Sequence, residues 1–167
     1  MFFKKKPADD VPLEASDELL RRVREHMPEA TSEDAALVGA IAGLFACVAY
    51  ADRDYSEAER EAVRRELERV HGLTAAGVNA VSELLDQRIA ELARESLQTY
   101  TRVLYDGTAR ELRVEVLDVL VDLAAADENL TMDETTLLRR VARGLGLSDE
   151  EYNQSQARHR DRLSVLK

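Results

Sequence analysis

The chain has 167 residues, of which 45% are apolar and 34% are charged, and its formal net charge is −10. This composition fits one globular domain with its own core and excludes a disordered chain. So large a negative charge repels phosphate groups, and nucleic acid is therefore not expected as a partner. Because Cys47 is the only cysteine, no intrachain disulfide forms, and its apolar neighbours predict a buried thiol.

The first 14 residues are predicted to be a flexible N-terminal tail (1–14), and the folded domain is expected to span residues 15–167. Pro7 and Pro12 interrupt any helix in this tail. The tail lacks the apolar central region of a signal peptide, so a cytoplasmic location is expected. Phe2 and Phe3 stand next to three lysines, which leaves open a contact with an anionic membrane surface.

Apolar residues at helical spacing predict α-helices along the rest of the chain. An opening helix near 17–27 has Leu19, Leu20 and Val23 on one side and ends before Pro28. No stretch shows the alternation of apolar and polar residues that is typical of a strand. Further helices are expected near 32–51, 57–70, 75–93, 97–105, 109–126, 132–143 and 149–164.

Two of these helices, 32–51 and 109–126, are predicted to be the central and most buried ones. No charged residue occurs from Ala35 to Ala51, so this stretch resembles a membrane span. It is slightly short for a span, is rich in Ala and contains Gly39 and Gly43. A buried helix in the core of the domain is therefore the preferred interpretation.

Several helices are expected to begin at a capping box, in which a Ser or Thr and a Glu three residues later each accept the other's backbone N–H. One such match is common by chance, but repeated matches that each open a helical pattern are stronger evidence. The complete pairs are Ser56/Glu59, Thr108/Glu111, Thr131/Glu134 and Ser148/Glu151, and Thr31/Asp34 is a weaker relative.

An internal repeat links residues 48–59 with residues 123–134. Each stretch follows a long apolar helix, has the pattern Asp-x-(Asp/Asn)-x-(Ser/Thr)-x-x-Glu and opens a polar helix. The repeat predicts a duplicated unit, near 35–93 and 109–164, whose two copies bury their apolar faces against each other. The expected fold is all-α: a single-domain bundle of about seven helices with two pseudo-symmetric three-helix halves.

The two turns with this pattern, called the acidic turns below, are the candidate functional site. Alternating side-chain oxygens in a tight turn are what Ca²⁺ or Mg²⁺ requires, although the Gly and the final Glu of an EF-hand loop are missing. Helix capping alone explains much of the same pattern, because Asp also favours the N-terminal end of a helix. Both interpretations stay open, and the candidate cation ligands are Asp52, Asp54, Glu59, Asp127, Asn129 and Glu134.

At the acidic turns the chain resembles the tellurite-resistance TerB family, over roughly residues 32–155. The resemblance implies an all-helical protein with pseudo-symmetric halves, located in the bacterial cytoplasm and linked to a stress, metal or tellurite response. It also implies that the acidic residues of the motif form the functional surface, with a metal as one ligand. The family turn, Ala-Asp-Gly-x-(apolar)-Ser-x-x-Glu, aligns with Ala51, Asp52, Tyr55, Ser56 and Glu59, and again with Ala126, Asp127, Leu130, Thr131 and Glu134.

One position departs from the family pattern, since the family's Gly is Arg53 in the first turn and Glu128 in the second. If that Gly serves a positive φ, a non-glycine residue costs about 1 kcal/mol there. Two outcomes are expected: either the turn is remodelled, or Asp54 and Asn129 take the strained conformation instead.

The expected function is non-enzymatic: a cytoplasmic scaffold or binding module of the TerB type that takes a divalent cation or a basic partner through the acidic turns. A protein partner is expected, and a membrane-associated partner and a homodimer are among the alternatives. No phosphate-binding glycine loop and no nucleophile motif occurs in the sequence.

Two other functions compete with this one. A metal-dependent hydrolase would require Asp52, Asp54, Asp127 and Glu134 to converge around an open coordination position. A purely structural dimerisation module would require separated acidic turns and a large exposed apolar patch. The residues alone name neither the ion nor the partner.

Overall fold

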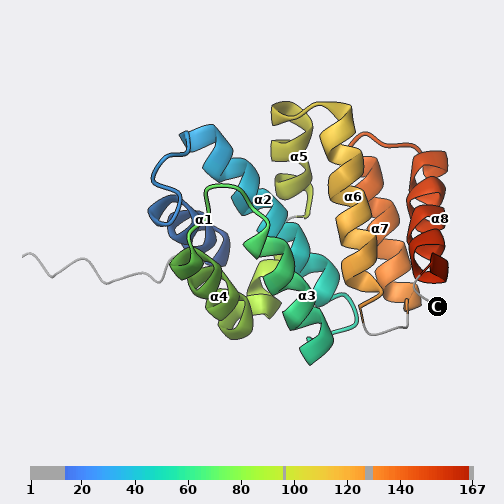
Figure 1. The fold of residues 1–167 in the computed structure, drawn as a ribbon, viewed down its shortest axis with the longest axis horizontal. Coiled ribbons are helices and arrows are strands. Elements are labelled where there is room, and N and C mark those ends of the chain that lie inside the picture. Colours follow the sequence, from blue (N-terminus) through green and yellow to red (C-terminus); the bar gives the residue numbers. More distant parts are fainter. Residues whose placement is uncertain (1–13, 96, 127–129, 166–167) are drawn as a thin grey trace, which may run out of the picture.

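The computed structural model describes residues 14–95, 97–126 and 130–165 (Figure 1). The predicted flexible tail lies outside the described residues except for Glu14, and the predicted domain bounds stay a prediction. The described residues form eight helices joined by turns, where about seven helices were expected. The helices are α1 (Ala15–Glu25), α2 (Ser32–Ala49), α3 (Glu57–Glu68), α4 (Ala75–Arg94), α5 (Leu97–Gly107), α6 (Arg110–Ala124), α7 (Met132–Gly144) and α8 (Asp149–Val165).

The helix ends follow the capping rule at most of the predicted sites. Ser56 and Thr131 begin α3 and α7 with complete capping boxes. Ser148 and Glu151 exchange the same two bonds at the start of α8, and Thr31 accepts the Asp34 N–H at the start of α2. Side-chain oxygens thus satisfy N–H groups that have no partner inside the helix.

The capping box predicted at Thr108 and Glu111 is wrong. Helix α6 begins at Arg110, and its N-cap is Ala109, which provides no side-chain bond. The Thr108 hydroxyl instead donates to the Leu104 carbonyl at 2.5 Å. Because α5 continues as far as Gly107, the free carbonyls of its last turn lie within reach of Thr108 and bind the hydroxyl.

Helix α2 is the central element of the fold, as predicted. It packs against α1, α4, α5 and α6, and every residue from Ala42 to Ala49 is buried. Ser32–Ala49 is long and apolar enough to cross a membrane by length and composition, a test that a buried core helix also passes. Its packing against four other helices agrees with the core interpretation.

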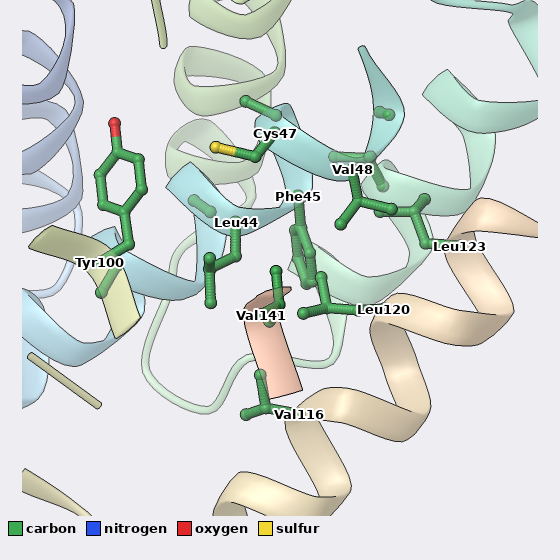
Figure 2. Packing of buried hydrophobic residues seen from close by; sticks show 14 of the residues in the cluster. Leu44, Phe45, Cys47, Val48, Tyr100, Val116, Leu120, Leu123 and Val141 are labelled. Atoms are coloured by element: carbon green, nitrogen blue, oxygen red, sulfur yellow. The ribbon is translucent and has the colours of Figure 1, made fainter. Parts of the chain in front are cut away.

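The second predicted central helix, α6, faces α2 across the core. Figure 2 shows Phe45 and Val48 of α2 meeting Leu120 and Leu123 of α6, with Val141 of α7 close by. All five side chains are almost completely buried, and burying one such side chain stabilises the fold by about 1.5–3 kcal/mol. The two long apolar helices therefore meet at the centre of a core to which the other helices also contribute.

The two halves repeat the same arrangement of contacts. Helix α2 packs on α4 as α6 packs on α8, and α3 packs on α4 as α7 packs on α8. Across the halves, α3 contacts α6 and α7 contacts α2, which is the pairing that a twofold relation between the halves requires. Helices α1 and α5 stand outside this relation, because α1 packs on α2 and α4 whereas α5 packs mainly on α2.

Candidate functional site

The first acidic turn joins the C-terminal end of α2 to the N-terminal end of α3. The Asp52 Oδ1 atom accepts the Asp54 N–H at 3.0 Å, which is the hydrogen bond of an Asx turn. Asp52 is half-buried, whereas Asp54 is exposed. Asp52 therefore stabilises the turn, and Asp54 is the more accessible of the two carboxylates.

Arg53, between these two residues, has a φ of 65° and is the only non-glycine residue with a positive φ in the described part of the chain. Both outcomes expected from the sequence are thus wrong for the first turn. The left-handed position is retained, and Arg53 itself takes the strained conformation instead of Asp54. An L-residue in this region costs about 1–2 kcal/mol, because its Cβ approaches the following carbonyl oxygen.

The two glutamates of the repeated motif are buried. Glu59 is 1% exposed and Glu134 is 0% exposed. The Ser56 N–H and hydroxyl both donate to Glu59 Oε2, at 2.8 and 3.0 Å, and the Thr131 N–H donates to Glu134 Oε2 at 2.7 Å. A buried carboxylate is costly unless it accepts hydrogen bonds, so these two glutamates first serve as helix caps.

The second acidic turn is described only at its two edges. Asp127 and Asn129, two of the candidate ligands, lie outside the described residues, as does Glu128. Helix α6 and the two residues that follow it, 125–126, lead into the turn, and Leu130 and Thr131 lead out of it. Leu130 and Met132 are exposed apolar side chains beside Thr131.

The two turns start from neighbouring helix ends. Figure 2 places Val48, the last residue but one of α2, beside Leu123, the last residue but one of α6. Helix α3, which follows the first turn, also contacts α6. In Figure 1 the turn after α2 lies at the lower edge of the molecule, near the lower end of α6. The fold thus brings the starting points of the two repeats together.

Tyr55 and Arg60 cover the first turn on the side of α3. The Arg60 guanidinium lies over the Tyr55 ring, 4.9 Å from its centroid, and Arg60 Nε donates to the Tyr55 carbonyl at 3.3 Å. Burial raises the pKa of Tyr55 well above its usual value, and the nearby Asp86 carboxylate adds to the shift. The phenol therefore stays neutral and acts as a packing group.

Within the described ranges, the acidic residues do not form a complete cation site. No group of three or more His, Cys, Asp or Glu side chains there is arranged to hold a metal ion. One oxygen of Asp52 and one of Glu59 already accept hydrogen bonds. The carboxylates of the first turn would need oxygens from the second turn or from water to reach the six or more ligands that Ca²⁺ requires.

The burial of Glu59 and Glu134 was not predicted from the sequence. The capping pattern places each glutamate at the start of a helix, but it does not show that another helix covers that helix end. In the structure α3 contacts α6 and α7 contacts α2, so each of these helices packs against the other half. A possible signal was the repeat itself, since two halves that pack face to face bury equivalent positions.

Comparison with known proteins agrees with the repeat and the fold. The family model of tellurite resistance protein TerB matches residues 39–157, well over half of the chain and close to the stretch in which the resemblance was recognised. No curated protein and no solved structure matches. With its all-helical halves and its repeated acidic turn, the chain belongs to the tellurite resistance protein TerB family.

Proposed function

We propose that this TerB-type chain is a non-enzymatic binding module of the cytoplasm, which takes a positively charged ligand on the surface formed by its two acidic turns. The observation that carries the proposal is the adjacency of the two helix ends from which the turns start, marked by Val48 and Leu123. The two acidic turns, which share the Asp-x-(Asp/Asn) pattern, therefore begin at neighbouring helix ends. The ligand is a divalent cation or the basic side chains of a protein partner.

The charge of the first turn supports this choice of ligand. Asp54 is exposed, and the second oxygen of the half-buried Asp52 accepts no hydrogen bond among the described residues. Carboxylate oxygens of this kind bind hard cations, and they pair equally with lysine or arginine side chains. The first turn leads into the N-terminal end of α3, where the positive end of the helix dipole favours carboxylates.

The competing functions gain no specific support. The hydrolase hypothesis needs a converging group of carboxylates, and no such group occurs among the described residues. The dimerisation hypothesis needs a contiguous apolar patch. The large exposed apolar side chains of the described residues are instead divided between the junction of α5 with α6 and the start of α7, and they are Tyr105, Leu112, Leu130 and Met132.

The proposal is tested by calorimetric titration of the metal-free chain with Mg²⁺, Ca²⁺ and Mn²⁺, and separately with a lysine-rich peptide. Saturable binding of a cation or of the peptide is expected, and it should disappear in the Asp52→Ala/Asp127→Ala variant. The control is Glu29→Ala/Asp106→Ala, which removes the same charge at two exposed positions outside the turns. This control should bind as the parent does.

The outcomes separate the two kinds of ligand. Binding of cations that is lost only in the turn variant makes the turns a cation site. Binding of the peptide alone makes them a docking surface for a basic partner. The proposal is refuted if neither ligand binds, or if the control variant loses binding to the same extent.

A further inference from the structure

A cleft of about 630 Å³ opens between the two halves, beside the first acidic turn. Its walls come from the end of α2 and the turn after it, from the junction of α4 with α5, and from α7. A volume of this size falls within the range of small-molecule sites, which is roughly 300–1,000 Å³. The cleft therefore has room for a small organic molecule.

Three arginines from three different elements line this cleft: Arg53, Arg94 and Arg140. None of them forms an ion pair with any of the residues that the structure describes, and Arg94 only donates its Nε–H to the Ala90 carbonyl, at 3.1 Å. Many other arginines of this acidic chain do form ion pairs, for example Arg21 and Arg158. Guanidinium groups without carboxylate partners are suited to bind an oxyanion, because their N–H groups match the geometry of phosphate and carboxylate oxygens.

Two carboxylates, those of Glu95 and Asp133, also line the cleft, and the three arginines exceed them by one positive charge. Both oxygens of Glu95 accept the Ser16 N–H, at 3.2 and 3.1 Å, so this carboxylate is engaged at the N-terminal end of α1. Asp133 is exposed in the first turn of α7. Cys47 adds no charge at neutral pH, because burial raises the pKa of its thiol to about 12.

The backbone at Arg53 is a second and independent indication. This residue keeps a positive φ, which costs about 1–2 kcal/mol for any residue except glycine. Strained residues concentrate at ligand-binding positions, where the side chain gives a benefit that offsets the strain. Here the strained residue is one of the three that bring a guanidinium group to the cleft.

We propose that this cleft binds a small organic anion, whose phosphate or carboxylate group pairs with Arg53, Arg94 and Arg140. Leu97 and Leu137, which line the same cleft, contact the apolar part of that molecule. The proposed ligand has the opposite charge to the one proposed for the acidic turns. Arg53 belongs both to the cleft and to the first acidic turn, so the two proposed regions adjoin, and they are tested with different ligands and different variants.

The experiment is a titration of the ¹⁵N-labelled full chain with phenyl phosphate and, in parallel, with phenylacetate. Saturable changes in the amide signals of Ala51, Arg53, Leu97, Gln98 and Leu137 are expected with at least one of the probes. Binding should weaken by about tenfold or more in the variant Arg53→Gly/Arg94→Ala/Arg140→Ala, because each lost guanidinium removes charge-assisted hydrogen bonds. Circular dichroism checks that this variant folds.

The control variant is Arg24→Ala/Arg65→Ala/Arg102→Ala, which removes the same charge at exposed arginines that do not line the cleft. It should keep the affinity of the parent, and a preference for one probe identifies phosphate or carboxylate as the bound group. The proposal is overturned by the absence of saturation up to about 10 mM of either probe. It is equally overturned by signal changes outside the cleft, or by equal losses in both variants.

Discussion

Gly43 of α2 lies directly against the ring of Tyr100 of α5, so closely that a Cβ atom on Gly43 would be 2.5 Å from Tyr100 Cε1. The ring is buried in the core, and its hydroxyl donates to the Leu92 carbonyl at 3.5 Å. The close approach of α5 to α2 therefore depends on the missing side chain at Gly43.

The variant Gly43→Ala is expected to unfold with a free energy about 1–3 kcal/mol lower than the parent, because the added methyl group overpacks the core. Urea denaturation followed by circular dichroism measures this change. Gly39→Ala, in the same helix, is the matched control. A Cβ there would lie 3.4 Å from Leu20 Cδ1 and 3.9 Å from Leu20 Cα, so this variant should gain about 0.5–1 kcal/mol from the stiffer backbone.

Arg53→Gly is expected to raise the free energy of unfolding by about 0.5–1 kcal/mol, because glycine adopts a positive φ without a steric cost. Part of the gain is offset by the larger conformational entropy of glycine in the unfolded chain. Arg53→Ala removes the same guanidinium but keeps the strained backbone, so it should be no more stable than the parent. Equal stability of the two variants would show that the φ of residue 53 costs nothing.

Glu59→Ala is expected to lower the free energy of unfolding by about 1–3 kcal/mol, since it removes a charged acceptor from two partly buried donors of Ser56. Glu57→Ala, at an exposed position in the same helical turn, should change stability by about 0.5 kcal/mol or less. Thermal and urea unfolding of both variants measure the difference. A similar loss of stability in the two variants would contradict this prediction, because it would mean that Glu59 contributes no more than an exposed carboxylate in the first helical turn of α3.

Acid unfolding is expected to depend on Glu18. Hydrogen bonds from Arg21 and then Arg22 lower the pKa of Glu18 to about 2, from the ordinary value of about 4.5 in the unfolded chain. A lowered pKa in the folded state stabilises the fold at pH values above the unfolded pKa, and this contribution is lost as the pH falls toward the folded pKa. The advantage of the parent over Glu18→Gln should thus be constant near neutral pH and shrink from about pH 4.5 to about pH 2.

Unfolding curves at a series of pH values test this prediction, and a double-mutant cycle provides the control. In an Arg21→Ala background the effect of Glu18→Gln should be smaller, because the strongest partner of the carboxylate is gone. A pH-independent difference between parent and Glu18→Gln would contradict the shifted pKa.

Most of the helices could be predicted from the sequence, because capping residues and apolar composition act within a few residues of the helix that they mark. Ser56, Thr131 and Ser148 act on N–H groups within three residues, and α2 differs from its neighbours by composition alone. The prediction at Thr108 failed because its hydroxyl could either cap the following helix or bind a carbonyl of the preceding one. The sequence does not show that α5 continues as far as Gly107, which brings the Leu104 carbonyl within reach of the hydroxyl.

The candidate site was less predictable because it depends on distant elements. The only sign of an unusual turn at Arg53 was that the family pattern has glycine at this position. The pattern could not show which residue of this chain takes the positive φ. Arg94 and Arg140 gave no signal, since nothing in the sequence places them next to Arg53. The cover over Glu59 and Glu134 likewise arises only when the two halves pack together.

The bond between Ser16 and Glu95 spans 79 positions of the chain, and it connects the first helix to the wall of the proposed anion cleft. The family match begins at residue 39, after α1, yet Leu19 and Val23 of this helix are completely buried. Loss of α1 would remove more than apolar cover, because the Ser16 N–H would go with it. The carboxylate of Glu95, which already lines the cleft, would then be free to pair with an arginine and to compete with an incoming anion.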